Sequence, residues 1–278
     1  MYLERYGKMD NDQTRREGWE WLQERSPLFG GIRFLRRREL VDENGVELDG
    51  GRALSPYTII DGKMASTQRA LEKITGEAFE ELSCYPEAIQ PFLGRRVGQA
   101  TLGTAWEVAR DLGIMRPMVK SIGTKRTTVE ILPTQEECEL LLNSGRFNAD
   151  LPLWVTEEVR FAAEYRFFIA LDSVLGWTCY LYDGGGIVFP NPEEVYKVIS
   201  AYAESGTAPW GYVLDIGLTE KGPGELEQVV IEVNDVLWSG TWGLSMSQAR
   251  SLSLFARWLE ISMGREKGRE VLKNLYSK

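Results

Sequence analysis

The chain has 278 residues and contains no histidine. Without histidine there is no Ser-His-Asp triad, no Cys-His pair and no imidazole ligand for zinc or iron. Whatever chemistry occurs here must use carboxylates, lysine, arginine, backbone amides and metal ions. Phosphoryl transfer fits that constraint, because its catalysis consists mostly of positioning and of neutralising charge.

Cysteine is scarce and long apolar runs are lacking. Cys84, Cys138 and Cys179 lie far apart and form no paired motif, which argues against a disulfide framework, a zinc site and a CxxC redox centre. The longest apolar run, residues 167–171, is far short of the ~20 residues of a membrane-spanning helix, and residues 1–21 lack the apolar core of a signal peptide. We therefore expect a cytoplasmic protein with no membrane partner.

Basic residues are outnumbered by acidic ones, 32 to 41, so the formal net charge is −9. This balance argues against a general binder of nucleic acid or membrane surfaces, and the local basic cluster of Arg33 and residues 36–38 is typical of a solvated face. With 43% hydrophobic and 26% charged residues, the chain has the composition of a soluble globular protein with two or three subdomains.

The strongest local pattern is a pair of apolar runs, residues 211–217 and 228–234, which flank a turn-rich connector and predict a hairpin. Side chains alternate along a strand, so Glu232 and Asn234 project to one surface, and in-register pairing brings Asp215 to the same surface. Two carboxylates and an amide oxygen are hard ligands that suit Mg²⁺. An edge hairpin with solvated acids is the alternative, but solvated acids rarely lie within such apolar runs.

Three further charged residues lie in or beside apolar strand patterns. Glu164 and Arg166 are two residues apart in the predicted strand 161–171 and project to one face, where such a pair is costly to bury unless the charges bind each other or a ligand. A mutual salt bridge is the alternative that involves no ligand. Lys120 ends the predicted strand 115–120 beside a turn rich in Gly, Ser, Thr and Lys, where it can meet nucleotide phosphates. Surface hairpins often carry the same residue types, so Lys120 alone does not decide the function.

The remaining hydrophobic periodicity predicts a mixture of helices and strands without internal repeats. The first third of the chain is an α/β region with no signature of its own. Predicted helices cover residues 11–25, 66–75, 104–112, 134–142, 192–205 and 247–263. Further predicted strands cover residues 32–35, 39–40, 46–48, 57–60 and 174–182.

The segment VVIEVND, followed by a Trp/Gly-rich stretch and preceded by YVLDIG, resembles the C-terminal metal-binding hairpin of ATP-grasp enzymes. The clade that it resembles is the one named for two arginines and a lysine. The resemblance covers about residues 100–245 and implies an α+β fold, in which two α/β subdomains sandwich the nucleotide after a smaller N-terminal α/β domain. We accordingly expect an N-terminal domain over residues 1–98, an ATP-grasp domain over 99–265 and a basic C-terminal tail over 266–278.

The resemblance also implies roles in ATP binding. Lys120 would contact the α-phosphate, and Lys125 lies in the lid loop, residues 123–126. Glu164 would lie near the ribose, while the planar fork of Arg166 suits the terminal phosphates. The family's hinge, whose backbone groups read the adenine edge, corresponds to Glu157, Glu158 and Val159.

The same resemblance implies a magnesium site and a second arginine. Of the clade's two arginines only Arg166 is evident, and Arg160 and Arg250 are candidates for the other. Mg²⁺, as two ions, would bridge the β- and γ-phosphates. Its implied protein ligands are the three side chains of the hairpin, Asp215, Glu232 and Asn234.

The activity that the resemblance implies is an ATP-dependent carboxylate–amine ligase, which forms carbon–nitrogen bonds. A substrate carboxylate attacks the γ-phosphorus to give an acylphosphate, and an amine captures it as an amide with release of ADP and phosphate. Lys120 and Arg166 would act in catalysis by neutralising the charge that develops. The expected partners are small-molecule or peptide carboxylates and amines, and nucleic acid is not expected.

Three other functions stay open on the sequence. A kinase on the same scaffold would make a stable phosphate ester. Lys120-Ser121-Ile122-Gly123 matches the KxxG pattern of nucleotidyltransferase-type nucleic-acid ligases, in which the lysine takes AMP covalently, although so short a match is common by chance and the acidic surface disfavours nucleic acid. A non-catalytic nucleotide-binding module is the third, and the intact acid set argues against it.

Overall fold

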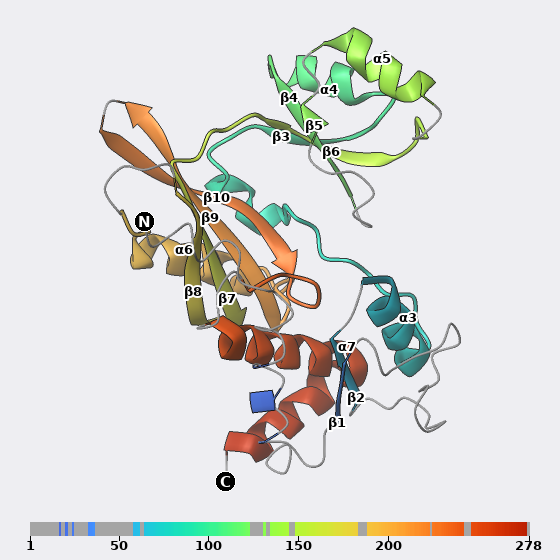
Figure 1. Ribbon diagram of the computed structural model, residues 1–278, viewed down its shortest axis with the longest axis vertical. Coiled ribbons are helices and arrows are strands. Elements are labelled where there is room, and N and C mark those ends of the chain that lie inside the picture. The colour runs from blue at the N-terminus through green and yellow to red at the C-terminus, as the bar shows by residue number, and fades with distance from the viewer. Residues whose placement is uncertain are drawn as a thin grey trace.

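The computed structural model shows an α+β protein built around two four-stranded antiparallel sheets (Figure 1). The predicted lid loop with Lys125 and the predicted strands at 39–40 and 46–48 lie outside the described residues. The structure describes residues 33–36, 58–61, 64–122, 130–131, 134–144, 148–182, 188–222, 224–241 and 246–276, together with Glu17, Glu20, Trp21 and Glu24.

The smaller sheet carries its helices on one side, at the top of Figure 1. Its elements are β3 (Val97–Thr101), α4 (Ala105–Asp111), β4 (Pro117–Ser121), β5 (Glu130–Ile131), α5 (Gln135–Asn143) and β6 (Pro152–Glu157). The strand order is β3-β6-β4-β5. Ala105 and Ala109 of α4 belong to the same core cluster as Val119 of β4, so the alternation of β4 turns its next residue, Lys120, away from α4.

The larger sheet has the order β10-β9-β7-β8, with every neighbouring pair antiparallel. Its strands are β7 (Ala163–Ala170), β8 (Ser173–Tyr182), β9 (Gly211–Gly222) and β10 (Glu225–Asp235). Helices cover parts of both faces: η2 (Glu87–Phe92), a 3-10 helix, and α6 (Pro192–Glu204) on one face, and α7 (Ser247–Tyr276) on the other.

Alternate side chains of this sheet belong to two different cores. Phe167 and Leu214 pack in the core beneath α6, while Phe168 and Val213 pack beneath α7. The apolar face predicted for α6 is buried as expected, and its N-terminus is capped by the Asn191 side chain. The strand positions that share a face with α7 but extend beyond it carry the charged residues of the candidate site.

The predicted hairpin is confirmed, and it pairs Glu232 directly with Asp215. The pairing is interrupted by a bulge between Val230 and Glu232, where Ile231 is the extra residue of β10. In a regular strand Val230 and Glu232 would share a face. Because of the bulge, Val230 enters the core beneath α6 while Glu232 faces the other side with Asp215. The sequence pattern did not predict this bulge.

The first third of the chain contributes a small parallel pair of strands and one helix. α3 packs against α7, in agreement with the predicted α/β character of this region. The elements are β1 (Arg33–Arg36), β2 (Thr58–Asp61) and α3 (Met64–Thr75).

The segment expected to be a basic C-terminal tail is helical as far as Tyr276. α7 breaks at Gly264, which has φ 76° and ψ 162°, and then continues as a helix to Tyr276. Glycine adopts that backbone conformation without strain. Gly268 packs so closely on Trp210 that a Cβ atom would lie 2.7 Å from the indole ring. No helix in the described part of the chain is both long and apolar enough to span a membrane.

Candidate active site between the two sheets

The centre of the candidate site is a buried ion pair between β7 and β9. Arg166 and Asp215 are register partners, and the guanidinium donates from Nε to Asp215 Oδ1 at 2.9 Å and from Nη2 to Oδ2 at 2.7 Å. Asp215 is fully buried. Burial acts to lower the pKa of Arg166, but the hydrogen bonds and charge of Asp215 outweigh it and raise that pKa, so the guanidinium stays charged.

Asn234 joins Asp215 to Glu232. Its Nδ2 donates to Asp215 Oδ2 at 3.0 Å and to Glu232 Oε1 at 2.7 Å, so both carboxylates direct an oxygen to the same point. A divalent cation fits this donor set when the amide turns to present Oδ1 instead of Nδ2. Among the described residues no group of three or more Cys, Asp and Glu side chains could hold a metal ion, so the amide oxygen is needed as the third ligand.

Lys120 enters the site from the other sheet. Its ammonium group pairs with Glu232 Oε2, although the two residues are 112 positions apart in the sequence. The Lys120 side chain is 13% exposed and that of Glu232 is 19% exposed, so both are largely but not fully buried. The structure therefore brings together Lys120, Arg166 and the three predicted metal ligands.

Glu164 lies on the same sheet face as Arg166 but does not pair with it. Arg166 binds Asp215 rather than Glu164, so the alternative of a mutual Glu164–Arg166 salt bridge is wrong. The Glu164 carboxylate instead accepts a hydrogen bond from Tyr180 of β8, whose ring centroid lies 5.3 Å from the Arg166 Cζ atom. Burial raises the pKa of Glu164, and the bond from Tyr180 offsets part of that increase.

The predicted hinge links the two sheets, and its acidic side chains are engaged within the protein. Glu157 accepts the Arg96 N–H at 2.8 Å and also binds its guanidinium, and this hydrogen bond lowers the pKa of Glu157. Glu158 pairs with Arg116 at 3.0 Å. The N–H groups of Glu157 and Glu158 donate to the carbonyls of Arg96 and Arg116. If this segment binds an adenine edge, the contacts would therefore come from its carbonyl groups and from Val159.

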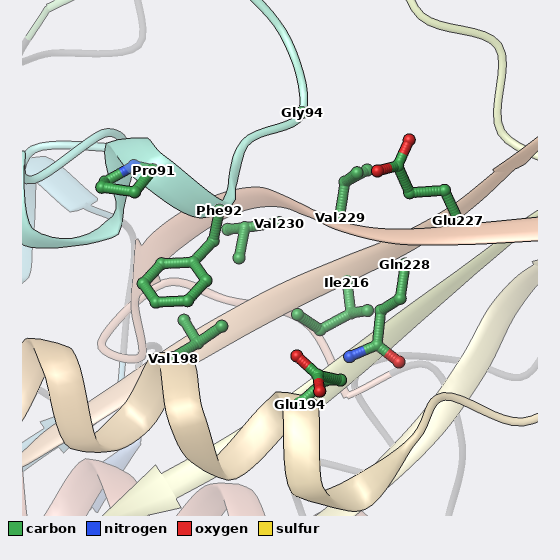
Figure 2. A pocket seen from close by; sticks show the side chains of 10 residues that line it. All are labelled: Pro91, Phe92, Gly94, Glu194, Val198, Ile216, Glu227, Gln228, Val229 and Val230. Carbon is green, nitrogen blue, oxygen red and sulfur yellow. The ribbon is translucent and has the colours of Figure 1, made fainter. Parts of the chain in front are cut away.

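Cavities border the larger sheet on both of its faces, and two of them differ in their lining. One of about 640 Å³ is lined by the hinge, including Val159, and by the far end of the hairpin, including Thr219. Thr219 is four residues from Asp215 on β9, so this cavity opens on the face that carries the charged cluster. The other cavity, of about 160 Å³, lies between η2, α6 and β10, where Val198 and Ile216 line it (Figure 2). The sheet separates it from the candidate site.

The two candidates for the second arginine contact different parts of this region, and Arg160 lines the cavity beside the hinge. Arg250 is 2% exposed and donates from Nε to the Ser239 carbonyl at 2.7 Å, while Arg166 binds the next carbonyl, that of Gly240, at 3.2 Å. Arg250 therefore supports the loop after β10. The carbonyl of Arg160 accepts a hydrogen bond from Thr219 at the hinge.

Sequence reasoning missed Tyr180 and Arg95. Tyr180 is the extra residue of a bulge in β8, which no local pattern announces. Arg95 reaches the hairpin across 135 residues of sequence. Neither residue belongs to a motif, so only the folded chain reveals their contacts.

Several solved structures are similar to this chain. An ATP-grasp RimK domain protein from Sphaerobacter thermophilus is 14% identical, with 80% of this chain and 86% of that chain covered and a TM-score of 0.45. The D-alanine–D-alanine ligase from Bacillus anthracis, complexed with ATP, is 16% identical, with 78% and 70% covered and a TM-score of 0.42. The ATP-grasp ligase PsnB, complexed with a phosphomimetic variant of a minimal precursor, Mg and ADP, is 14% identical, with 90% and 95% covered and a TM-score of 0.43. No curated protein matches the chain.

A protein-family model provides the assignment. The model for the ATP-grasp domain of the clade named for two arginines and a lysine, family 2, matches residues 92–252, which is more than half of the chain. The matched range contains both four-stranded sheets, and the resemblance expected from the hairpin is confirmed. The protein therefore has the ATP-grasp fold and belongs to family 2 of this two-arginine, one-lysine clade of ATP-grasp domains.

Proposed function

We propose that this ATP-grasp protein is an ATP-dependent ligase that joins a carboxylate to an amine through an acylphosphate. The observation that carries the proposal is the meeting of Lys120 from one sheet with Glu232 from the other, next to the Arg166–Asp215 pair. Cations and carboxylates that face one space are what a site for a metal–polyphosphate needs. Family membership supports ATP as the source of that polyphosphate.

Lys120 and Arg166 would bind the phosphates of ATP. An incoming polyphosphate competes with Glu232 for the Lys120 ammonium, which releases the carboxylate to act as a metal ligand. Asp215, Glu232 and the Asn234 amide oxygen would hold Mg²⁺, which would supply positive charge to the phosphate oxygens.

The reaction would proceed in two balanced steps. An oxygen of the substrate carboxylate forms a bond to the γ-phosphorus while the bond from that phosphorus to the bridging oxygen breaks, and ADP leaves. The amine nitrogen then forms a bond to the acyl carbon and loses a proton, and phosphate leaves. Neither step forms a covalent enzyme intermediate, in keeping with a chain that has no histidine.

The alternatives receive less support from the site. Capture of AMP by Lys120 requires a lysine available as a nucleophile, whereas its ammonium is engaged with Glu232. A kinase shares the nucleotide site, and its product separates it from a ligase: a phosphate ester accumulates without an amine.

Calorimetry of ATP binding with and without Mg²⁺ tests the proposal. The wild type is expected to bind Mg·ATP, and Glu232→Gln is expected to lose the Mg²⁺-dependent part of the affinity. Glu225→Gln, an exposed acid of the same strand, serves as the matched control. Phosphate release that depends on both a carboxylate and an amine would then support the ligase. A wild type that binds no Mg·ATP would refute the assignment.

A further inference from the structure

The bulge in β10 decides where the proposed metal ligand Glu232 points. Val230 pairs with Ile216 and Glu232 pairs with the next residue of β9, Asp215, so Ile231 has no counterpart. A one-residue change in register moves every following side chain to the other face of a strand. Without the bulge, Glu232 would face the core beneath α6 and be separated from Asp215.

Bulges leave backbone groups outside the regular ladder, and here one side chain satisfies them. Arg95 donates from Nη1 to the carbonyl of Val230 at 3.0 Å and from Nη2 to the carbonyl of Ile231 at 2.5 Å. These are the carbonyls on the two residues that precede Glu232. The rigid fork of a guanidinium suits two neighbouring acceptors, which a single ammonium group cannot hold in the same geometry.

The segment that carries Arg95 lies against β10, which is at the edge of the sheet. Figure 2 shows the chain after η2 passing over β10 at Gly94, close to Val229 and Val230. Gly94 has φ +60°, and a Cβ atom there would lie 2.3 Å from Val229 Cγ1, so only glycine permits this approach. At the far side of the bulge, the N–H of Val233 donates to the carbonyl of Cys84 at 2.9 Å.

We propose that Arg95 is a positioning residue, which fixes the bulge at Ile231 and so holds Glu232 beside Asp215 for metal binding. The metal-binding part of this inference rests on the proposed function. The clamp itself rests on the contacts of Arg95 with β10, which exist without any ligand. No observed hydrogen bond joins Arg95 to the side chain of Glu232 or of Asp215. Its effect on Glu232 therefore passes through the backbone of β10.

The test compares wild type, Arg95→Met, Arg95→Lys and Arg110→Met. Arg110 is an exposed arginine of α4 and serves as the matched control. Amide hydrogen exchange is measured without ligand for peptides that cover residues 228–234 and, as an internal reference, 163–170. ATP binding is measured by calorimetry with and without Mg²⁺ on the same four proteins.

Arg95→Met is expected to speed exchange in residues 228–234 while the reference strand keeps its rate. Its Mg²⁺-dependent ATP affinity is expected to fall about 10- to 100-fold, as for the loss of other residues that orient a metal ligand, with ATP affinity in the absence of Mg²⁺ changed less than about twofold. Arg95→Lys should lie between Arg95→Met and wild type, and Arg110→Met should match wild type. If Arg95→Met does not fold, Arg95→Lys carries the comparison.

Two outcomes in the variants would overturn the inference. Unchanged exchange in residues 228–234 would mean that Arg95 does not hold the bulge. Faster exchange in these residues with an unchanged Mg²⁺ dependence of ATP affinity would mean that Arg95 stabilises β10 without positioning Glu232 for metal binding. A wild type that binds no Mg·ATP is a separate result, because it refutes the proposed function and removes the ligand that Arg95 would position.

Discussion

Two clusters of buried charge lie at the end of the hairpin, and their surroundings differ. The helix cluster joins the end of β10 to α7: Arg257 binds Asp235 at 3.1 Å and Glu260 at 3.0 Å, and Arg265 binds Glu260 at 2.7 Å. Every member except Arg265 is at most 9% exposed. The site cluster consists of Lys120, Arg166, Asp215, Glu232 and Asn234.

The comparison shows that buried charge alone does not mark an active site. Asn234 and Asp235 are neighbours in β10, but Asn234 binds Asp215 and Glu232 whereas Asp235 binds Arg257 of α7, so they belong to different clusters. The helix cluster is closed by protein groups: Glu260 also accepts the Trp210 N–H at 2.9 Å. The site cluster draws its side chains from two sheets, and the Lys120 and Glu232 side chains keep 13% and 19% of their surface exposed.

The largest expected effect is on stability, at Arg257. Arg257→Met would leave Asp235 and Glu260 buried without their shared cation, and we expect the free energy of unfolding to fall by about 3–5 kcal/mol. Mg²⁺ should not restore it, because the cluster is closed. Chemical denaturation with and without Mg²⁺ measures both effects, with exposed Arg110→Met as the control. A loss below about 1 kcal/mol would contradict the comparison.

The same substitution at Arg166 should instead remove activity. Arg166→Met is expected to lower the rate of carboxylate- and amine-dependent phosphate release about 100-fold or more, because the proposed function assigns Arg166 as a charged donor to the reacting phosphates. It also leaves Asp215 without its cation, so the protein should be destabilised. Mg²⁺ should reverse part of this destabilisation, since a ligand that binds the folded state stabilises it. If Mg²⁺ changed the free energy of unfolding of Arg166→Met and of Arg257→Met by the same amount, the distinction between the two clusters would be wrong.

Lys120→Met should have a smaller effect. Loss of one charge-assisted contact to phosphate is expected to weaken ATP binding about tenfold. The free energy of unfolding should change by no more than about 1 kcal/mol, because the Lys120–Glu232 pair is partly exposed. Calorimetry measures the ATP affinity and chemical denaturation measures the free energy of unfolding. Lys197→Met, at an exposed ion pair of α6, is the control. An unchanged ATP affinity would exclude Lys120 from the nucleotide site.

The smallest expected effect is a change in pH dependence at Tyr180. Burial raises the pKa of Glu164 and the Tyr180 hydroxyl lowers it, so Tyr180→Phe should raise that pKa further. The Glu164 carboxylate would then become protonated at a higher pH as the solution is acidified. ATP affinity should therefore begin to decline at a higher pH than in the wild type. The aromatic ring over Arg166 is retained. Calorimetric pH profiles of Tyr180→Phe and the control Tyr182→Phe make the test, and superimposable acid limbs would contradict it.

Local patterns of the sequence predicted many of the elements, although they did not predict β3 or η2. The period of two in β9 and β10 predicted the hairpin, and the spacing of apolar residues predicted the buried face of α6. The distinctive segment VVIEVND led to the correct family. Such patterns depend on neighbours within a few residues, so a single chain displays them directly.

The partners of the charged residues were decided by the tertiary structure. Glu164 and Arg166 do share a face, as their spacing predicted. The register between β7 and β9, however, places Arg166 opposite Asp215, and these two residues form the ion pair. The Lys120–Glu232 pair and the Arg95 contacts join segments more than a hundred residues apart. A bulge likewise depends on which strand lies alongside. Amino-acid order determined which faces could carry charge, whereas strand register and the approach of the two sheets determined which charges meet, because those depend on packing across the whole domain.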